Sequence, residues 1–372
     1  MKHIIVAGGG VAAFESAVSA RKFDPECRIT LYSGEELLPY RRPALSALAA
    51  NDDPPSGTFF IRDAEFYAQS GIDVKLGIAV NRIDPEHHTI QLSDGSFDHY
   101  DSLVIATGSA ARRIPVPGAD GSNVFVLREY KDLLKLRSFL GGKALHVAVI
   151  GGGVLGLELA DSLLKRACRV TVIESADRLL PRNLDADGSD FAEKVMKGTA
   201  QLEFLSGKVV KEINHRAVVL EDSMIECDCV VFSAGSTPLI PDCENLRITR
   251  GIEVDSHMRT NLPDIFAAGD VALFGNIPCG LYTTASKMGQ TAGCCAAGGD
   301  AEFVIQSNPV RLNALGLKLF SIGVIDENLK NEQQINENTY SRTFFNQDGK
   351  MVGAVLIGDI SRAVQLQKLI NG

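Results

Sequence analysis

The residues best suited to chemistry form a glycine cluster near the middle of the chain, followed at a distance by an acid. They are Gly151, Gly153, Gly156 and Glu174. A short apolar run over residues 146–150 precedes the glycines, and a second run over residues 169–173 leads into the acid. Such glycines let the backbone turn tightly and approach a pyrophosphate at a helix N-terminus, while the acid accepts hydrogen bonds from ribose hydroxyls. The pattern predicts a dinucleotide-binding site.

A second cluster of the same kind lies at the N-terminus. Gly8, Gly10 and Ala13 follow the apolar run of residues 3–7. Alanine at the third position still permits close packing of a helix against a strand. Two nucleotide sites on one chain predict a donor and an acceptor cofactor held face to face.

The acid of the N-terminal cluster is missing. Aligning residues 28–33 with residues 169–174 puts Ser33 where Glu174 stands in the central cluster. Glu35 and Glu36 are two candidates for a substitute, and the sequence does not choose between them. The first site is therefore expected to bind its ribose less conventionally than the second.

Two more polar positions are candidate cofactor contacts. Arg41 and Arg42 lie in a Pro-rich segment, and a guanidinium group suits a pyrophosphate or an adenine ribose. The alternative is a solvated arginine pair in a loop. Asp270 ends the strand-like run 263–270, where it can accept hydrogen bonds from a sugar-like hydroxyl chain. The alternative for Asp270 is a helix N-cap with no ligand.

The elements that must position these residues alternate between strand and helix. Each nucleotide unit closes with a buried strand and a turn of small residues, over residues 102–108 and 229–235, which indicates an internal duplication. Asp94–Gly95 predicts a hairpin turn. The other expected elements are strands over residues 73–76, 79–83 and 89–92 and a small-residue helix over residues 285–297.

A different pattern begins near residue 306. It predicts strands over residues 318–324, 341–345 and 351–358, with a charged loop between the first two and a turn at residues 346–349. A final helix is expected over residues 360–370. These elements predict a small α+β domain.

Composition excludes several function classes. The 372 residues carry a net charge of −9 with no basic tail, which argues against nucleic acid as a partner. No apolar run is long enough for a membrane span. The eight cysteines show no C-x-x-C and no zinc spacing, so we expect no metal site and reduced thiols in the cytoplasm. Cys294–Cys295 is either ordinary packing or a vicinal redox pair.

With these motifs in order, the chain resembles the FAD-dependent pyridine nucleotide-disulfide oxidoreductases. Within that family the stretch of residues 39–46 and the chain length are most similar to NADH:rubredoxin reductases and to the flavoprotein part of NADH-dependent nitrite reductases. The resemblance implies an α/β fold of two Rossmann-like domains, as in glutathione reductase, with a small α+β C-terminal domain. The expected domains are 1–113 with 240–303 for FAD, 114–239 for NAD, and 306–372.

The resemblance also implies the cofactors FAD and NADH and a set of contact residues. FAD would be held by Gly8, Gly10, Ala13, Arg42, Val80, Thr107, Gly108, Arg112, Gly269 and Asp270. NADH would be held by Gly151, Gly153, Gly156, Glu158, Glu174 and Gly235. Glu158 would reach the junction of flavin and nicotinamide and is the one candidate catalytic side chain. Glu174 predicts NADH rather than NADPH, because an acid there repels a 2′-phosphate.

Two departures from the family pattern bear on mechanism. Members that reduce disulfides carry a C-x4-C where residues 37–47 of this chain hold no cysteine, so dithiol chemistry is not expected there. Some ferredoxin reductases place a lysine that can pair with the helix glutamate at the position that is Ala47 here. Glu158 is therefore expected to lack that partner.

The function expected from the resemblance is electron transfer from NADH through FAD to rubredoxin or a similar small iron protein, by a monomer or homodimer. Arg41, Arg42 and Lys287 are the candidate docking residues. Alternatives are an NADH oxidase, with Cys279 as its candidate redox cysteine, the NADH-oxidising component of a nitrite reductase, and a non-enzymatic FAD- and NAD-binding signalling module.

Overall fold

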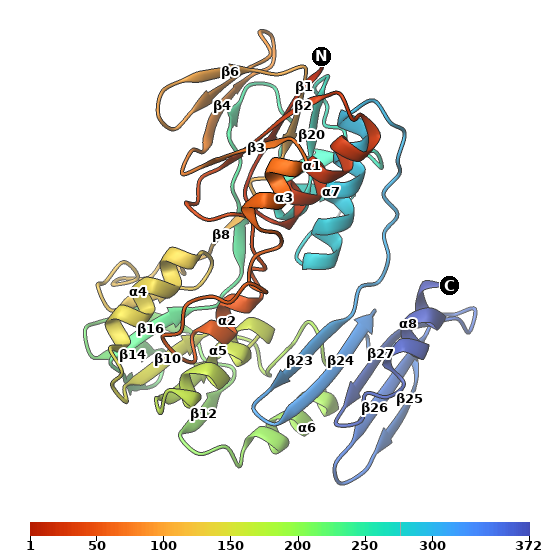
Figure 1. The fold of residues 1–372 in the computed structure, drawn as a ribbon. Helices are drawn as coiled ribbons and strands as arrows, with labels where there is room; N and C mark the ends of the chain where they lie inside the picture. The colour runs from red at the N-terminus through yellow and green to blue at the C-terminus, as the bar shows by residue number, and fades with distance from the viewer. Residues whose placement is uncertain (276) are drawn as a thin grey trace. The chain divides into compact units, whose positions relative to one another are not determined.

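The structure is a computed structural model that describes residues 1–275 and 277–372. By its contacts the chain divides into two compact units (Figure 1). Unit 1 comprises residues 1–44, 54–110 and 236–305, and unit 2 comprises residues 45–53, 111–235 and 306–372. The three domains expected from the sequence stay a prediction.

The main sheet of unit 1 is parallel and five-stranded, with the order β20-β7-β1-β2-β3. Its strands are β1 (His3–Ala7), β2 (Arg28–Ser33), β3 (Ile72–Leu76), β7 (Ser102–Ile105) and β20 (Ile265–Ala267). The helices of unit 1 are α1 (Val11–Phe23), α3 (Ala64–Gln69), η1 (Gly269–Val271) and α7 (Tyr282–Ala296). Its smaller sheets contain β4 (Val80–Asp84), β5 (Thr89–Leu92), β6 (Phe97–His99) and β18 (Asp242–Cys243); β19 (Ile252–Val254), β21 (Ala272–Phe274) and β22 (Ile277–Pro278); and β8 (Ser109–Ala111) with β17 (Ser236–Pro238).

The main sheet of unit 2 is also parallel and five-stranded, with the order β12-β11-β10-β16-β9. Its strands are β9 (Val124–Val126), β10 (His146–Ile150), β11 (Arg169–Ile173), β12 (Leu202–Leu205) and β16 (Cys229–Phe232). The helices of the unit are α2 (Ala44–Leu48), α4 (Tyr130–Leu140), α5 (Val154–Lys165), α6 (Ala186–Met196) and α8 (Ala363–Asn371). An antiparallel sheet contains β13 (Val210–Ile213), β14 (Ala217–Leu220) and β15 (Met224–Glu226).

The two main sheets repeat one another, which confirms the predicted duplication. Strands β1 and β10 each pair with the strand that follows them, β2 or β11, so that a histidine lies opposite an arginine, His3 with Arg28 and His146 with Arg169. Each histidine ring shares a hydrogen bond with a buried threonine of the neighbouring strand, at 2.9 Å for His3 with Thr30 and 2.8 Å for His146 with Thr171. The backbone N–H of each histidine donates to an aspartate just before the strand on the other side, Asp101 before β7 or Asp228 before β16.

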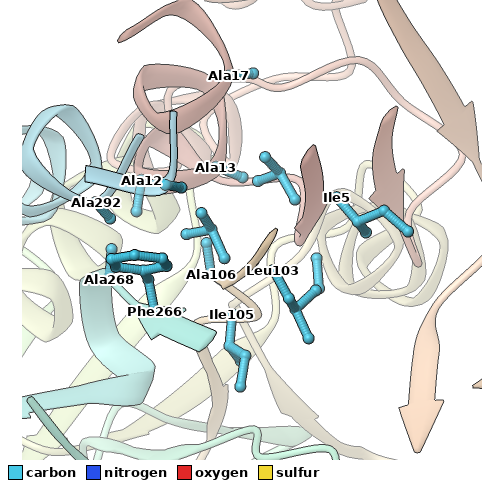
Figure 2. Close-up of a cluster of buried hydrophobic side chains, with 14 of the residues drawn as sticks. Ile5, Ala12, Ala13, Ala17, Leu103, Ile105, Ala106, Phe266, Ala268 and Ala292 are labelled. Carbon is cyan, nitrogen blue, oxygen red and sulfur yellow. The ribbon is translucent and has the colours of Figure 1, made fainter. Parts of the chain in front are cut away.

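Small residues let helices α1 and α7 pack closely in the core of unit 1. A Cβ atom on Gly289 would lie 2.4 Å from the carbonyl oxygen of Ala12, and one on Gly293 would lie 2.0 Å from that of Ser16. The Ser16 hydroxyl donates to the Gly289 carbonyl at 3.1 Å. Figure 2 shows the alanines of α1 in the same cluster as Phe266 and Ala292. The helix expected over residues 285–297 begins three residues earlier, at Tyr282.

The C-terminal part of unit 2 is an antiparallel sheet with the order β23-β24-β27-β26-β25, together with helix α8. Its strands are β23 (Val310–Ala314), β24 (Leu317–Gly323), β25 (Lys330–Ile335), β26 (Tyr340–Phe345) and β27 (Met351–Ile357). The charged loop expected between the first two predicted strands is wrong in part, because residues 330–335 form the edge strand β25. Most side chains of β25 are exposed, so no alternation of apolar and polar residues marks it as a strand.

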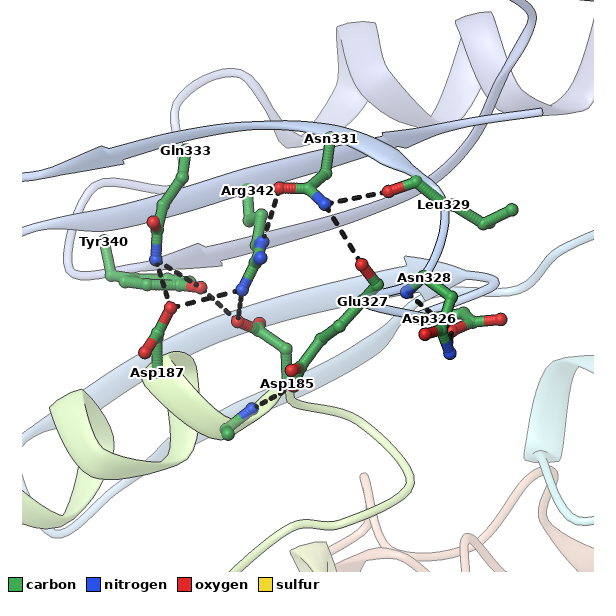
Figure 3. Close-up of polar contacts among 11 residues, drawn as sticks. Asp185, Asp187, Asp326, Glu327, Asn328, Leu329, Asn331, Gln333, Tyr340 and Arg342 are labelled. Carbon is green, nitrogen blue, oxygen red and sulfur yellow. Dashed lines mark hydrogen bonds and ion pairs between the residues drawn. The ribbon is translucent and has the colours of Figure 1, made fainter. Parts of the chain in front are cut away.

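A polar network joins this sheet to the start of α6 within unit 2 (Figure 3). The buried carboxylate of Asp185 accepts hydrogen bonds from the Tyr340 hydroxyl and, at 2.6 Å, from the Arg342 guanidinium. Asp187 accepts from Gln333 at 2.8 Å, and the Glu327 carboxylate accepts from the Ala186 amide at 2.7 Å.

No helix in the described part of the chain is long and apolar enough to cross a membrane.

Candidate functional site

Helices α1 and α5 begin at glycines that leave the first N–H groups without a side-chain partner. Gly10 is the N-cap of α1 and Gly153 that of α5, and both have extended backbone conformations. Neither helix has a side-chain cap or an acid in its first turn. Each N-terminus therefore presents backbone donors and the positive end of the helix dipole to an anion.

The glycines of each cluster have two different roles. Gly8 and Gly151 have positive φ angles of 140° and 119°, and a Cβ atom there would lie 2.0 Å from the Ala106 oxygen or 2.4 Å from the Ser233 oxygen. The fold itself requires these two glycines.

Gly10 and Gly153 face open space instead. A Cβ atom on Gly10 would meet no atom closer than Arg42 Nε at 4.0 Å, and one on Gly153 would meet nothing within 4 Å. Packing does not explain these glycines, whereas a ligand that approaches the backbone does. The residues of both clusters therefore fit the pyrophosphate of a dinucleotide.

The third position of the fingerprint differs between the units. A Cβ atom on Gly156 would lie 2.0 Å from the Gly151 carbonyl oxygen, so unit 2 needs glycine there. Ala13 is fully buried in unit 1, where the packing accommodates its methyl group.

Glu174 lies at the end of β11, folded back onto the glycine turn. Its Oε2 accepts from the Gly152 amide at 2.7 Å, and its Oε1 accepts from the Ala176 amide at 2.8 Å and the Ser175 hydroxyl at 3.2 Å. These bonds fix the carboxylate beside the cluster of Gly151 and Gly153. Carboxylate oxygens have several acceptor positions each, so Glu174 keeps the capacity to bind a ribose hydroxyl.

Ser33 has no comparable role in unit 1, because it is 1% exposed and bonded to the backbone of Glu35. Glu35 itself carries an ion pair with Arg42 at 2.5 Å.

Asp270 lies in the 3₁₀-helix η1, directly after β20, and is half-buried. Its Oδ2 accepts from the Ser109 hydroxyl at 3.0 Å. Gly269 has a φ of 79°, and a Cβ atom there would lie 2.9 Å from that of Ala12 in α1. The structure thus brings Asp270 close to the helix that begins at Gly10.

The other predicted FAD contacts are divided between the units. Thr107 donates to the Leu239 carbonyl at 2.5 Å, and Gly108 has a φ of 73° in unit 1. Val80 is buried at the start of β4. Arg112 lies in unit 2, where its amide donates to the carbonyl of Gly235 at 2.9 Å. The contact between Arg112 and FAD therefore stays a prediction.

Glu158, one turn into α5, has a partner that the sequence did not reveal. The Ser46 hydroxyl donates to its Oε2 at 2.9 Å. Burial raises the pKa of Glu158, the hydrogen bond from Ser46 opposes that effect, and the negative charge of Asp161 adds to it. Glu158 is thus a half-buried carboxyl with a neutral partner, able to hold a proton more readily than an exposed glutamate.

Sequence reasoning also missed how the segment of residues 45–53 attaches to unit 2. Arg137 donates to the carbonyls of Leu48 and Asp53, at 2.5 and 3.0 Å, and Arg166 makes two bonds of 2.9 and 3.0 Å to Asp52. These partners are 84 to 114 residues apart in the chain, so no local pattern signals them.

The cysteines are free thiols, and burial raises the pKa of several. At Cys279 burial and the nearby Asp270 carboxylate raise the pKa to about 12, so this thiol is protonated at neutral pH. Burial also raises the pKa of Cys294 and of Cys295. Because the thiolate is the reactive form, the raised pKa disfavours redox chemistry at each of the three.

Comparison with known proteins identifies the family. Residues 2–292 match the model of the pyridine nucleotide-disulphide oxidoreductases. The chain belongs to this family. It is an oxidoreductase that uses FAD and NAD(H). Residues 309–372 match a second model, the C-terminal domain of rubredoxin NAD+ reductases.

Individual relatives support the same grouping. The NADH-rubredoxin oxidoreductase of Clostridium acetobutylicum is 32% identical over 99% of this chain and 94% of its own. A crystal structure of the NADH:rubredoxin oxidoreductase from that organism is similar with a TM-score of 0.82, at 30% identity over 99% of this chain and 94% of that one. A ferredoxin reductase from Rhodopseudomonas palustris has a TM-score of 0.88, at 27% identity over 98% and 93% of the two chains.

Proposed function

We propose that the chain oxidises NADH and passes the electrons through FAD to a small one-electron carrier protein, with rubredoxin as the carrier. The match of residues 309–372 to the C-terminal domain of rubredoxin NAD+ reductases carries the proposal. Similarity to an NADH-rubredoxin oxidoreductase over nearly the whole chain supports it. The eight free thiols suit a reducing compartment, so we assign the reaction to the cytoplasm.

In unit 2, the N-terminus of α5 would bind the NADH pyrophosphate. Gly151 provides the turn that the fold requires, and Gly153 leaves open space at the helix start. Glu174, fixed by two backbone amides, would bind the ribose 2′-hydroxyl and repel a 2′-phosphate.

In unit 1, Gly10 and the N-terminus of α1 would bind the FAD pyrophosphate, with Arg42 beside them. Asp270 would accept hydrogen bonds from the ribityl hydroxyls. When bound, FAD supplies a ring system that accepts a hydride and can release electrons one at a time. The protein contributes binding and orientation.

Glu158 is the one side chain to which we assign a part beyond binding. Its raised pKa and its bond from Ser46 make it a carboxyl that can hold a proton beside the NAD cluster. Such a group can donate a hydrogen bond to an acceptor or accept one from an amide, according to pH.

The protein surface that contacts the carrier is proposed to include Arg41 and Lys287. Rubredoxin-type carriers are expected to be acidic, so a local positive charge favours encounter despite the net charge of −9. Arg41 is exposed and donates to the carbonyls of Thr58 and Phe60, which holds its side chain in place. Arg42 pairs with Glu35, and its part in this surface stays a prediction.

Steady-state turnover with NADH tests the proposal against its alternatives. We expect rapid reduction of rubredoxin and slow consumption of oxygen when no carrier is present. Fast oxygen consumption that rubredoxin does not increase would identify an NADH oxidase, and no turnover with either acceptor would favour a nucleotide-binding module.

A further inference from the structure

Unit 1 lacks an acid at the end of β2, and the serine in its place is not accessible to a ligand. Ser33 is 1% exposed. The Glu35 amide donates to its hydroxyl at 3.2 Å, and the hydroxyl contacts the Glu35 carbonyl at 3.3 Å. In unit 2 the corresponding residue, Glu174, accepts from the amide of Gly152 instead. Any replacement in unit 1 must therefore come from another residue.

Glu35 is the nearest acid along the chain, but protein groups engage both of its carboxylate oxygens. Oε1 accepts from the Arg42 guanidinium at 2.5 Å, and Oε2 accepts from the Tyr40 hydroxyl at 2.6 Å. The side chain is only 13% exposed. This arrangement suits a residue that orients Arg42 better than one that binds a ribose directly.

Arg42 borders the start of α1. Its Nε is the nearest atom, at 4.0 Å, to the position that a Cβ on Gly10 would occupy. The N–H groups of the first turn of α1 have no side-chain cap. Arg42 therefore lies beside the helix N-terminus, an arrangement that suits a diphosphate.

Tyr40 supplies a fixed anchor for this arrangement. It is 2% exposed, and its ring stacks on Phe59 with centroids 4.6 Å apart and an interplanar angle of 14°. The Arg41 amide donates to the Phe59 carbonyl at 2.9 Å, so the loop that contains Tyr40 and Arg41 is also bonded to the segment that contains Phe59. A hydroxyl held in this way fixes Glu35 by donating to it, and it also accepts a bond from the Arg42 guanidinium at 3.3 Å. Glu35 holds the same guanidinium through its other oxygen.

We propose that Glu35, anchored by Tyr40, is a positioning residue that holds the Arg42 guanidinium ready for the diphosphate of FAD. The inference rests on the proposed function, because it assumes that FAD binds in unit 1. An arginine oriented before binding loses less side-chain freedom when the ligand arrives. The sign of the change in FAD affinity distinguishes two roles for Glu35. If its carboxylate only repelled the diphosphate, removing the charge would tighten FAD binding, whereas loss of an orienting residue weakens it.

The test is a titration of the full-length apoprotein with FAD, followed by quenching of flavin fluorescence. Glu35→Gln removes the charge, Glu35→Asp keeps the charge but shortens its reach, and Tyr40→Phe keeps the ring stacked on Phe59. We expect Glu35→Gln to raise the Kd for FAD about tenfold, because a change of this size corresponds to the loss of one charge-assisted hydrogen bond. The other two variants should weaken binding in the same direction. In an Arg42→Gln background Glu35→Gln should have no further effect, because its role runs through Arg42.

Unchanged or tighter FAD binding by Glu35→Gln would overturn the inference. An equal loss of FAD affinity from Glu35→Gln in the unmodified and the Arg42→Gln backgrounds would also overturn it. If Glu35→Gln does not fold, Glu35→Asp with and without Arg42→Gln decides by the same criteria. Failure of the unmodified apoprotein to bind FAD would be a different result, since it would refute the proposed function itself and the inference with it.

Discussion

Replacing Arg342 with methionine is expected to destabilise unit 2 strongly, because it leaves a buried carboxylate without its cation. The Asp185 side chain is 0% exposed and that of Arg342 only 11%, and their atoms lie 2.6 Å apart. No described residue donates a hydrogen bond to the other carboxylate oxygen, Oδ1. In Arg342→Met only the Tyr340 hydroxyl remains as a donor to Asp185. Breaking a buried pair in this way costs about 3–5 kcal/mol.

The assay is urea denaturation, with amide hydrogen exchange in β26 as the local readout. Lys211→Met is the matched control in the same unit, because Lys211 pairs with Glu221 at 3.4 Å and both side chains are at least half exposed. Such a pair contributes at most about 1 kcal/mol. The double variant Asp185→Asn with Arg342→Met should regain roughly half of the lost stability, since it removes the buried charge. A loss for Arg342→Met no larger than that for Lys211→Met would refute the reasoning.

Three further predictions follow from the cofactor sites and the duplicated sheets. Gly10→Val should bind FAD poorly yet keep the far-ultraviolet circular dichroism of the unmodified protein, because a Cβ atom there meets no protein atom closer than 4.0 Å. Gly153→Val, where a Cβ atom meets nothing within 4 Å, should lower NADH affinity in the same way. Glu174→Ala should lower the ratio of kcat/KM for NADH to that for NADPH. An unchanged ratio would show that this acid does not discriminate between a hydroxyl and a phosphate at the ribose 2′ position. Burial lowers the pKa values of His3 and His146 below the ordinary value of 6.5. Below that value the unfolded chain binds protons that the folded chain does not. The contribution of the two histidines to the free energy of unfolding is therefore fully present above about pH 6.5 and is lost as the pH falls below it. Replacing both histidines with glutamine should flatten the decline of Tm between about pH 7 and pH 5.5; a decline as steep as in the unmodified protein would assign it to other groups.

The parts of the fold that repeat or alternate could be predicted from the sequence. The two βαβ patterns predicted both main sheets, because glycine spacing and apolar runs are local signals. The edge strand β25 could not be predicted, since its exposed polar residues carry no periodicity. The start of α7 at Tyr282 was also missed, because its N-cap is Leu281, and leucine is not a residue that marks a helix start.

In the candidate site, too, the residues with local sequence signals could be predicted and the tertiary contacts could not. Glycines and the acid at Glu174 have fixed spacing and could be located in advance. The bond from Ser46 to Glu158 spans 112 residues, and the pairing of Glu35 with Arg42 depends on how a Pro-rich loop folds back. Such contacts arise from tertiary structure, so composition and periodicity contain no sign of them.

The central claim, that electrons pass from NADH through FAD to a small carrier, is tested most directly by anaerobic stopped-flow spectroscopy in two steps. The protein is first mixed with NADH and then with oxidised rubredoxin, while the flavin absorbance is followed. The account predicts that NADH bleaches the flavin band and that rubredoxin restores it faster than dissolved oxygen does. A flavin band that NADH does not bleach, or one that oxygen restores and rubredoxin does not, would contradict it.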